Sequence, residues 1–138
     1  MKIVLANDHA GFHLKIAVKK WLKSGINPAL IVSSNANRAF QTAEIVAKTL
    51  DYNPKNIEIE KDIYYTTTED LAEVLENQDD KYQSILIAGH NPSISFFANQ
   101  LSDNYKQLLP TGGLVAFELQ TNSWSSFRQS DRKLLFEL

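Results

Sequence analysis

The segment ILIAGHNP, residues 85–92, joins four apolar residues to a polar tetrapeptide. The apolar residues predict a strand buried on both faces, since a continuous apolar run is typical of a parallel sheet covered by helices. Pro92 suits the first turn of a helix and Asn91 suits its N-cap. The segment therefore predicts a strand, a short loop and a helix, whose buried side chains are expected to be Ile94, Phe97, Ala98 and Leu101.

A second segment upstream has the same pattern. Residues 29–32 form a continuous apolar run, which ends at Ser33-Ser34-Asn35. The hydroxyl and amide groups of this tripeptide suit the start of a helix, which we expect from about Ala36 to Leu50. Its inward side chains are expected to be Ala39, Ala43, Val46, Ala47 and Leu50.

The beginning of the chain repeats the pattern once more. Residues 3–6 form a short apolar run that ends at Asn7-Asp8-His9. Apolar residues then recur at helical spacing, which predicts a helix almost directly after the loop. These residues are Leu14, Ala17, Val18, Trp21 and Leu22.

The remaining elements complete one α/β domain, which we expect to span residues 1–138. Residues 57–60 alternate with period two, as a half-exposed edge strand does, and Thr67 with Asp70 resembles a capping box. Residues 114–119 and 134–138 predict two last strands. Because strands and helices alternate over most of the length, the sequence predicts a three-layer α/β/α fold with a mainly parallel sheet.

Composition excludes several functions and favours a soluble enzyme or binding domain. The 138 residues include 43% hydrophobic residues, enough for one core, and the formal net charge is −2. Nucleic acid is therefore not an expected partner, since no positive excess exists to hold a polyanion. The chain has no cysteine, which excludes a disulfide scaffold and a cysteine nucleophile.

The same observations suggest where the protein works. A chain without cysteine fits a reducing compartment, and the apolar run at residues 1–6 is too short for a signal peptide. No apolar run approaches the length that spans a membrane. We therefore expect a cytoplasmic protein with no membrane partner, whereas the sequence does not predict its oligomeric state.

Polar residues of three segments are expected to meet at one edge of the sheet, because ligands collect at the carboxyl ends of parallel strands. The apolar runs end at Asp8-His9, at Ser33-Ser34 with Arg38 one turn further, and at Gly89-His90. An imidazole can attack phosphorus, a guanidinium can hold two phosphoryl oxygens, and N–H groups at helix starts suit an anion. Together these groups predict phosphoryl transfer through a phosphohistidine.

Each of these residues also has an ordinary structural interpretation. A histidine in a loop is more often structural or solvated than catalytic, and an arginine in the first turn of a helix usually forms a surface ion pair. We expect His13, beside Lys15 and Lys20, to be solvated. No spacing brings the three histidines together with carboxylates, so a metal site is not predicted.

The motifs resemble those of a known family from about residue 26 onward. SSxxxRAxQTA at residues 33–43, GHNP at 89–92, PTGG at 110–113 and SW at 123–124 occur in the order found in the SixA-type phosphohistidine phosphatases of the histidine phosphatase superfamily. The resemblance implies an α/β fold, no cofactor, and hydrolysis of a phosphorylated substrate such as a phosphohistidine protein. It also implies that Arg38 holds the phosphoryl group and that His90 donates to its oxygens.

The first segment departs from that family. There the opening strand runs into Arg-His-Gly or Arg-His-Ala with a nucleophilic histidine, followed by a long loop, whereas here Asp8 precedes His9 and the loop is missing. The sequence DHAGFxLK at residues 8–15 instead resembles the first βα unit of the type B ribose-phosphate isomerases. The chain therefore resembles a chimera, with residues 1–22 as an atypical first βα unit and residues 23–138 as the phosphatase-like part. Isomerase activity is not expected, because that family's later glycine-rich loop has no counterpart here.

Two hypotheses follow for the function. In the first, the chain is a phosphatase that forms a phosphohistidine at His9, with Arg38 and His90 as further catalytic residues and with Asp8, Ser34 and Asn91 as candidate substrate-binding residues. An Asp8 carboxylate that points inward would impair this activity, whereas one that points away or orients His9 would preserve part of it. In the second, the chain is an inactive or engineered scaffold that at most binds phosphate.

Overall fold

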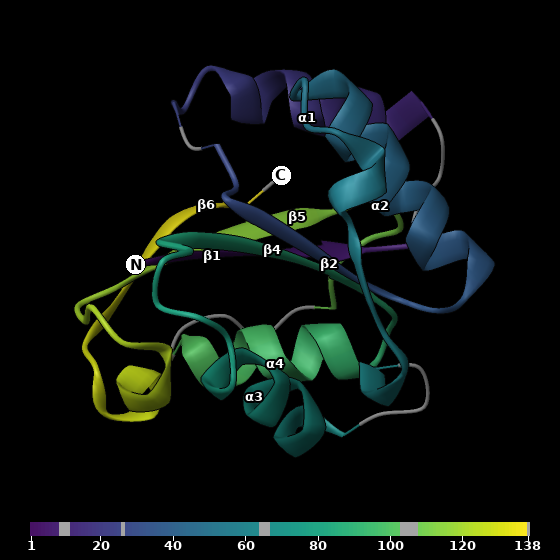
Figure 1. Ribbon diagram of the computed structural model, residues 1–138. Helices are drawn as coiled ribbons and strands as arrows, with labels where there is room; N and C mark the ends of the chain where they lie inside the picture. Colours follow the sequence, from purple (N-terminus) through teal and green to yellow (C-terminus); the bar gives the residue numbers. More distant parts are fainter. Residues whose placement is uncertain (9–11, 26, 64–66, 103–107, 138) are drawn as a thin grey trace.

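The computed structural model describes residues 1–8, 12–25, 27–63, 67–102 and 108–137, and all its strands belong to one six-stranded sheet (Figure 1). The strand order is β3-β2-β4-β1-β5-β6. The strands β3, β2, β4 and β1 run parallel to one another, whereas β5 is antiparallel to both of its neighbours, β1 and β6. The strands are β1 (Lys2–Asn7), β2 (Leu30–Ser34), β3 (Glu58–Glu60), β4 (Ser84–Gly89), β5 (Leu114–Leu119) and β6 (Arg132–Glu137).

Helices cover both faces of the sheet, as the alternation of elements predicted. The helices α1 (Phe12–Leu22) and α2 (Asn37–Thr49) lie on one face, and α3 (Thr68–Glu76) and α4 (Ser93–Leu101) lie on the other (Figure 1). Short 3₁₀ helices occur at η1 (Pro54–Asn56), η2 (Lys61–Ile63) and η3 (Trp124–Gln129). The three-layer α/β/α fold with a mainly parallel sheet is therefore confirmed. None of the helices in the described part of the chain combines the length and the apolar character needed to cross a membrane.

The core explains why the three apolar runs form central strands. In β1, Leu5 packs into the cluster beneath α3 and α4, whereas its neighbours Val4 and Ala6 pack into the cluster beneath α1 and α2. The apolar residues of β2 and β4 are divided between the two clusters in the same way. Each run is therefore buried on both faces, which is why it lacks the polar alternation of an exposed strand.

The caps predicted from the sequence are confirmed at α3, where the contacts are local, but not at α4. At α3, Thr67 accepts a hydrogen bond from the N–H of Asp70, whose carboxylate in turn accepts from the N–H of Thr67, so the capping box is confirmed. At α4, the prediction was wrong. Pro92 stands at the N-cap, not in the first turn, and no side chain caps the helix there. Asn91 makes other contacts, which are described with the site.

Two further boundaries differ slightly from expectation. Helix α2 begins at Asn37, and its N-cap residue Ala36 makes no side-chain cap, although the Ser34 hydroxyl accepts a hydrogen bond from the N–H of Ala36. Strand β6 begins at Arg132, two residues before the expected start, because it pairs with β5 as far as Leu119. Neither shift moves the carboxyl ends of β1, β2 and β4, which position the candidate site.

Candidate functional site

The carboxyl ends of β1, β2 and β4 lie side by side, because β4 pairs in parallel with both other strands. Asp8 follows β1, Ser34 ends β2, and His90 follows β4. Arg38 lies in the first turn of α2, which starts just after β2. The structure thus brings four of the predicted site residues together at one edge of the sheet.

One carboxylate oxygen stands at the centre of this group. The Oδ2 atom of Asp8 lies 3.6 Å from Nε of Arg38 and 3.9 Å from Nδ1 of His90. The side chain of Asp8 is 18% exposed and that of Arg38 is 66% exposed. Asp8 therefore points inward, toward the arginine and the histidine, which is the orientation that the sequence associated with impaired catalysis.

His90 is held from its other ring nitrogen by a serine. Its Nε2 atom lies 2.9 Å from the hydroxyl oxygen of Ser34, which also accepts the N–H of Ala36. Because a hydroxyl has one proton and two lone pairs, Ser34 can donate to Nε2 while it accepts from Ala36. The neutral imidazole then carries its proton on Nδ1, on the side of Asp8.

The charge of His90 depends on three opposing influences. Burial lowers its pKa below the ordinary value, the carboxylate of Asp8 raises the pKa, and the guanidinium of Arg38 lowers it. Burial is the largest influence, so the pKa of His90 is lower than that of a solvated histidine. Near neutral pH, the ring is thus a neutral group that offers one N–H donor and one acceptor.

The described contacts of the Asn91 side chain are not with the group of Asp8, Ser34, Arg38 and His90. Its side-chain amide donates a hydrogen bond of 2.7 Å to the carbonyl of Leu109, and its Oδ1 atom accepts from the hydroxyl of Ser95. The N–H of Leu109 in turn donates to the Ser95 hydroxyl. Asn91 therefore ties the start of α4 to the segment before β5, and its substrate-binding role stays a prediction.

The buried side chain of Asn7 also supports the site, which the sequence did not indicate. Its amide nitrogen lies within hydrogen-bond distance of the carbonyls of Leu109 and Pro110, at 3.3 and 3.2 Å. Next along the chain, the carbonyl of Asp8 accepts a hydrogen bond of 2.7 Å from the N–H of Gly112. The turn at residues 110–113 thus fixes the backbone at Asp8.

Two glycines give this turn its shape. Gly112 has φ of 73°, a conformation that residues with a Cβ atom rarely adopt. A Cβ atom added at Gly113 would lie 2.8 Å from the carbonyl oxygen of Pro110, closer than van der Waals contact allows. In the sequence, the two adjacent glycines of the PTGG motif indicate a tight turn. Only the fold shows that this turn supports the backbone at Asp8.

His9 lies outside the described residues, so its predicted role as nucleophile stays a prediction. Among the residues that the structure describes, no three histidine, aspartate or glutamate side chains gather as metal ligands would. The group at the sheet edge offers the guanidinium of Arg38 and the N–H of the His90 imidazole, which are donors suited to an oxyanion.

Comparisons with known proteins identify the fold. No protein-family model matches the sequence, and no curated protein matches it. Among solved structures, the putative phosphohistidine phosphatase SixA from Agrobacterium tumefaciens is similar over 99% of this chain and 96% of its own, with 18% identity and a TM-score of 0.77. The protein histidine phosphatase SixA complexed with tungstate is similar over 100% of this chain and 96% of its own, with 12% identity and a TM-score of 0.78.

The chain has a histidine-phosphatase-like fold. A mycobacterial glucosyl-3-phosphoglycerate phosphatase is also similar, over 96% of each chain, with 12% identity and a TM-score of 0.62. The similarity to the SixA structures extends over nearly the whole chain, so it includes most of residues 1–22, which the sequence set apart as an atypical first βα unit. Within the histidine-phosphatase-like fold, Asp8, Ser34, Arg38 and His90 occupy the edge where parallel α/β sheets bind their ligands.

Proposed function

We propose that this protein is a phosphohistidine-phosphatase-like hydrolase that acts through a phosphohistidine at His9. In this reaction, the imidazole of His9 attacks phosphorus, the bond to the substrate nitrogen breaks, and that nitrogen takes up a proton. Water then attacks the phosphohistidine, releasing inorganic phosphate and restoring His9. Arg38 and His90 stabilise the charge on the phosphoryl oxygens during both steps.

The observation that carries this proposal is the position of the Asp8 carboxylate. An anionic oxygen lies between the guanidinium of Arg38 and the imidazole of His90, which supports the view that these two groups bind an anion. Tungstate is an oxyanion of the same shape as phosphate, and one of the similar structures is a SixA protein in complex with it. We infer that a phosphoryl group binds beside Arg38 and His90 in this protein.

The same carboxylate implies slow turnover. Two unit charges about 4 Å apart repel each other by about 4 kcal/mol at an effective dielectric constant of 20, which is an upper value because Arg38 compensates Asp8. An arginine in place of Asp8 would add a charge-assisted hydrogen bond worth roughly 1.5–3 kcal/mol. About 1.4 kcal/mol corresponds to a tenfold change in rate, so the repulsion and the missing hydrogen bond each slow the reaction. We therefore propose that Asp8 impairs the enzyme. The alternative is a scaffold that binds phosphate without hydrolysing it.

The test is hydrolysis of phosphohistidine and of an aryl phosphate by the wild type and two variants. We expect slow phosphate release that His9→Ala abolishes, and an increase of at least about tenfold in Asp8→Arg. Activity unchanged in His9→Ala would refute the nucleophile. Phosphate binding without hydrolysis in both the wild type and Asp8→Arg would favour the scaffold.

Three accompanying proposals come from the sequence. The substrate is a phosphorylated molecule such as a phosphohistidine protein, because of the motifs shared with the SixA-type phosphatases. The cytoplasm is the proposed location, because the chain has no cysteine. A chimeric origin of the first βα unit, residues 1–22, also remains a proposal.

A further inference from the structure

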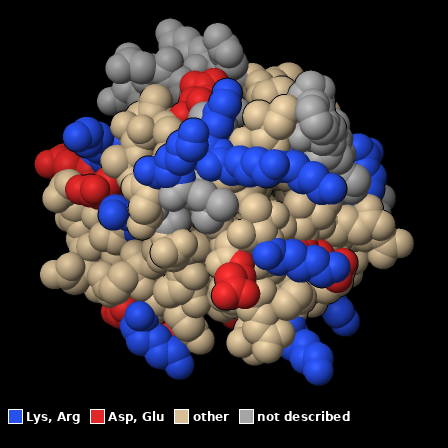
Figure 2. Space-filling view, turned by 90° about the horizontal axis from the view of Figure 1, so that it is seen from above, with Lys and Arg blue, Asp and Glu red and all other residues tan. Residues whose placement is uncertain are grey.

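Helix α1 has an exposed face that is strongly basic. Lys15 and Lys19 are four residues apart on the same side of α1, and Lys20 lies beside them. Lys23 follows in the turn directly after the helix. All four side chains are exposed, and residues 12–23 contain no acidic residue. Figure 2 looks down on the layer of α1 and α2 and shows Lys and Arg side chains gathered across it.

This lysine face is not explained by the stability of the fold. Like charges four residues apart destabilise a helix by about 0.2–0.5 kcal/mol per pair. Among the described residues, no salt bridge involves any of the four lysines. The chain as a whole has a net charge of −2, so the positive charge of this face is a local feature.

A groove runs beside the lysine face. It lies between α1 and the turn at residues 110–113, has a volume of about 310 Å³, and is lined from the helix by Ile16, Ala17 and Lys20. Ile16 is 38% exposed, so the groove offers an apolar contact next to a positive charge. The turn that forms its other wall also binds the backbone of Asp8 through Gly112.

The lysine face begins at the edge of the sheet that holds the candidate site. Because α1 follows β1 in the chain, its first turn, with Lys15, lies at the carboxyl end of that strand. Lys23 lies at the opposite end, in the turn just after Leu22, the last residue of α1. A macromolecule that inserts a phosphoryl group beside Arg38 and His90 would therefore cover Lys15 first and Lys23 last.

We propose that the lysine face of α1 and its groove dock an acidic protein segment that carries the phosphohistidine. This inference rests on the proposed function and adds the chemistry of the partner: carboxylates for the lysines and an apolar side chain for the groove. A lipid surface fits less well, because the apolar side chains Leu14, Val18 and Trp21 are buried in the core. Ile16 alone among the described apolar side chains of α1 is exposed.

The test compares three substrates: a phosphohistidine peptide with Asp and Glu flanks, the same peptide with Ser and Gln flanks, and an aryl phosphate. For the wild type, we expect roughly tenfold higher kcat/KM for the acidic peptide at low salt, falling as salt rises. The triple variant Lys15→Glu/Lys19→Glu/Lys23→Glu should remove this preference and leave the aryl phosphate unaffected. Ile16→Asp should weaken both peptides a few-fold.

A matched control separates local from net charge. The variant Lys55→Glu/Lys81→Glu/Lys133→Glu has the same net charge, but its substitutions are three exposed lysines outside α1. It should retain the preference for the acidic peptide. An equal loss in both triple variants would overturn the proposal, because the net charge would then explain the preference.

The remaining outcomes distinguish the docking surface from the proposed function. Equal turnover of both peptides by the wild type would overturn the docking surface and leave the phosphatase activity standing. If no substrate is turned over, the proposed function fails, and binding of the unphosphorylated acidic peptide, followed by fluorescence anisotropy, still tests the surface. Binding lost in the α1 variant would support it. Absence of binding, or stronger binding to anionic phosphatidylserine vesicles, would overturn it.

Discussion

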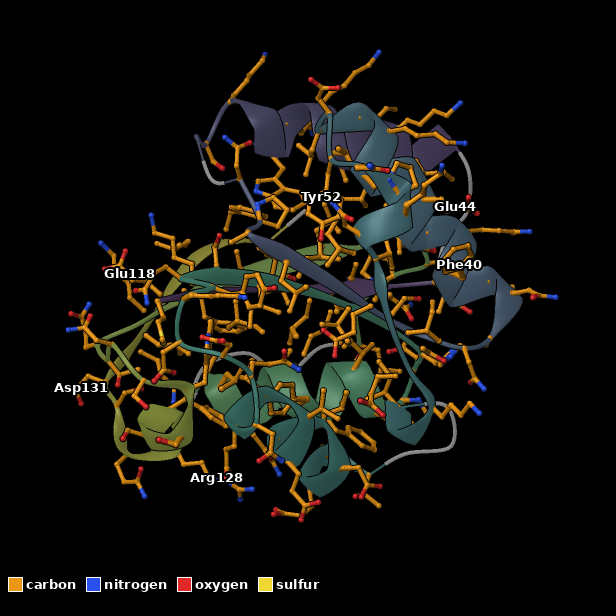
Figure 3. All side chains as sticks on the ribbon, viewed as in Figure 1. Phe40, Glu44, Tyr52, Glu118, Arg128 and Asp131 are labelled. Atoms are coloured by element: carbon orange, nitrogen blue, oxygen red, sulfur yellow. The ribbon has the colours of Figure 1, made fainter. Side chains whose placement is uncertain are left out.

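Two arginines on opposite sides of the sheet show how differently this protein uses the same side chain. Arg128 in η3 lies beside α3, on the face away from α1 and α2 (Figure 3). Its guanidinium binds both oxygens of Glu69, at 2.6 and 3.0 Å, and its Nε atom donates to Glu76. Arg38, in contrast, has one described charged partner, Asp8, at 3.6 Å.

The contrast separates a structural cluster from a binding site. Two carboxylates neutralise Arg128 and occupy its donors, so this cluster links η3 to α3 and has little capacity for a ligand. Arg38 is more exposed than Arg128, and its carboxylate partner lies beyond hydrogen-bond distance. Substitutions at the sheet edge should therefore change activity at nearly constant stability, whereas substitutions at Arg128 should do the reverse.

The largest expected effect is at His90. We predict that His90→Ala lowers kcat/KM for phosphohistidine by about 10³, within the range of 10²–10⁴ that a positioned acid–base group contributes. Near neutral pH the variant should unfold at a urea concentration only slightly below that of the wild type, because the neutral ring makes one described hydrogen bond, with Ser34. His90→Gln is the control, because its amide can replace one donor and should restore part of the rate. Wild-type activity in His90→Ala would remove His90 from the site.

An intermediate effect is expected at Asp8, where the change preserves shape. Asp8→Asn removes the carboxylate charge between Arg38 and His90, so we predict that kcat/KM rises about tenfold. Because the Asp8 charge raises the pKa of His90, its removal should lower that pKa further, which NMR titration of the ring would show. A pKa that rises in Asp8→Asn would contradict the geometry of the site.

The titration of His90 also determines how its contribution to stability changes with pH. Since burial lowers the pKa of His90, the unfolded chain binds a proton that the folded chain excludes as the pH falls below the ordinary histidine value. Stability from His90 is therefore complete above that value and is lost as the pH falls through the lowered pKa. In Asp8→Asn the pH range of this loss should become wider, because the folded-state pKa moves down.

The sequence predicted that Ser34, Arg38 and His90 meet, but not the side-chain contacts of Asn91. Ser34, Arg38 and His90 were expected at one edge because apolar runs mark buried strands, and parallel strands end at the same side of a sheet. The contact of Asn91 with Leu109 was not predictable from local pattern, because it joins residues 18 positions apart and replaced the expected cap. The backbone at Asp8 is likewise held by Gly112, far along the chain.

The ion pairs of Arg128 with Glu69 and Glu76 could not be predicted from the sequence either, because they join residues far apart in the chain. Glu69 lies in the first turn of α3. Its partner Arg128 is 59 residues away, and no periodicity links the two. Local patterns thus predict elements and caps, whereas ion pairs between elements depend on the finished packing.

The smallest expected effect is at Arg128, and it completes the comparison. We predict that Arg128→Met lowers Tm by only about 2 °C, because exposed ion pairs contribute little, and leaves kcat/KM unchanged. Arg38→Met is the matched substitution, which should lower kcat/KM about a hundredfold without lowering Tm, since it removes a charge-assisted contact with the phosphoryl group.

The pH dependence of the Arg128→Met effect gives a second check. The hydrogen bond with Arg128 lowers the pKa of Glu69, so the stability from this pair is present above the ordinary glutamate pKa. It is lost as the pH falls through the lowered pKa, and the Tm difference between wild type and Arg128→Met should vanish there. A Tm difference that persists in acid would mean that the aliphatic part of Arg128, and not its charge, holds η3 against α3, because methionine preserves only some of that packing.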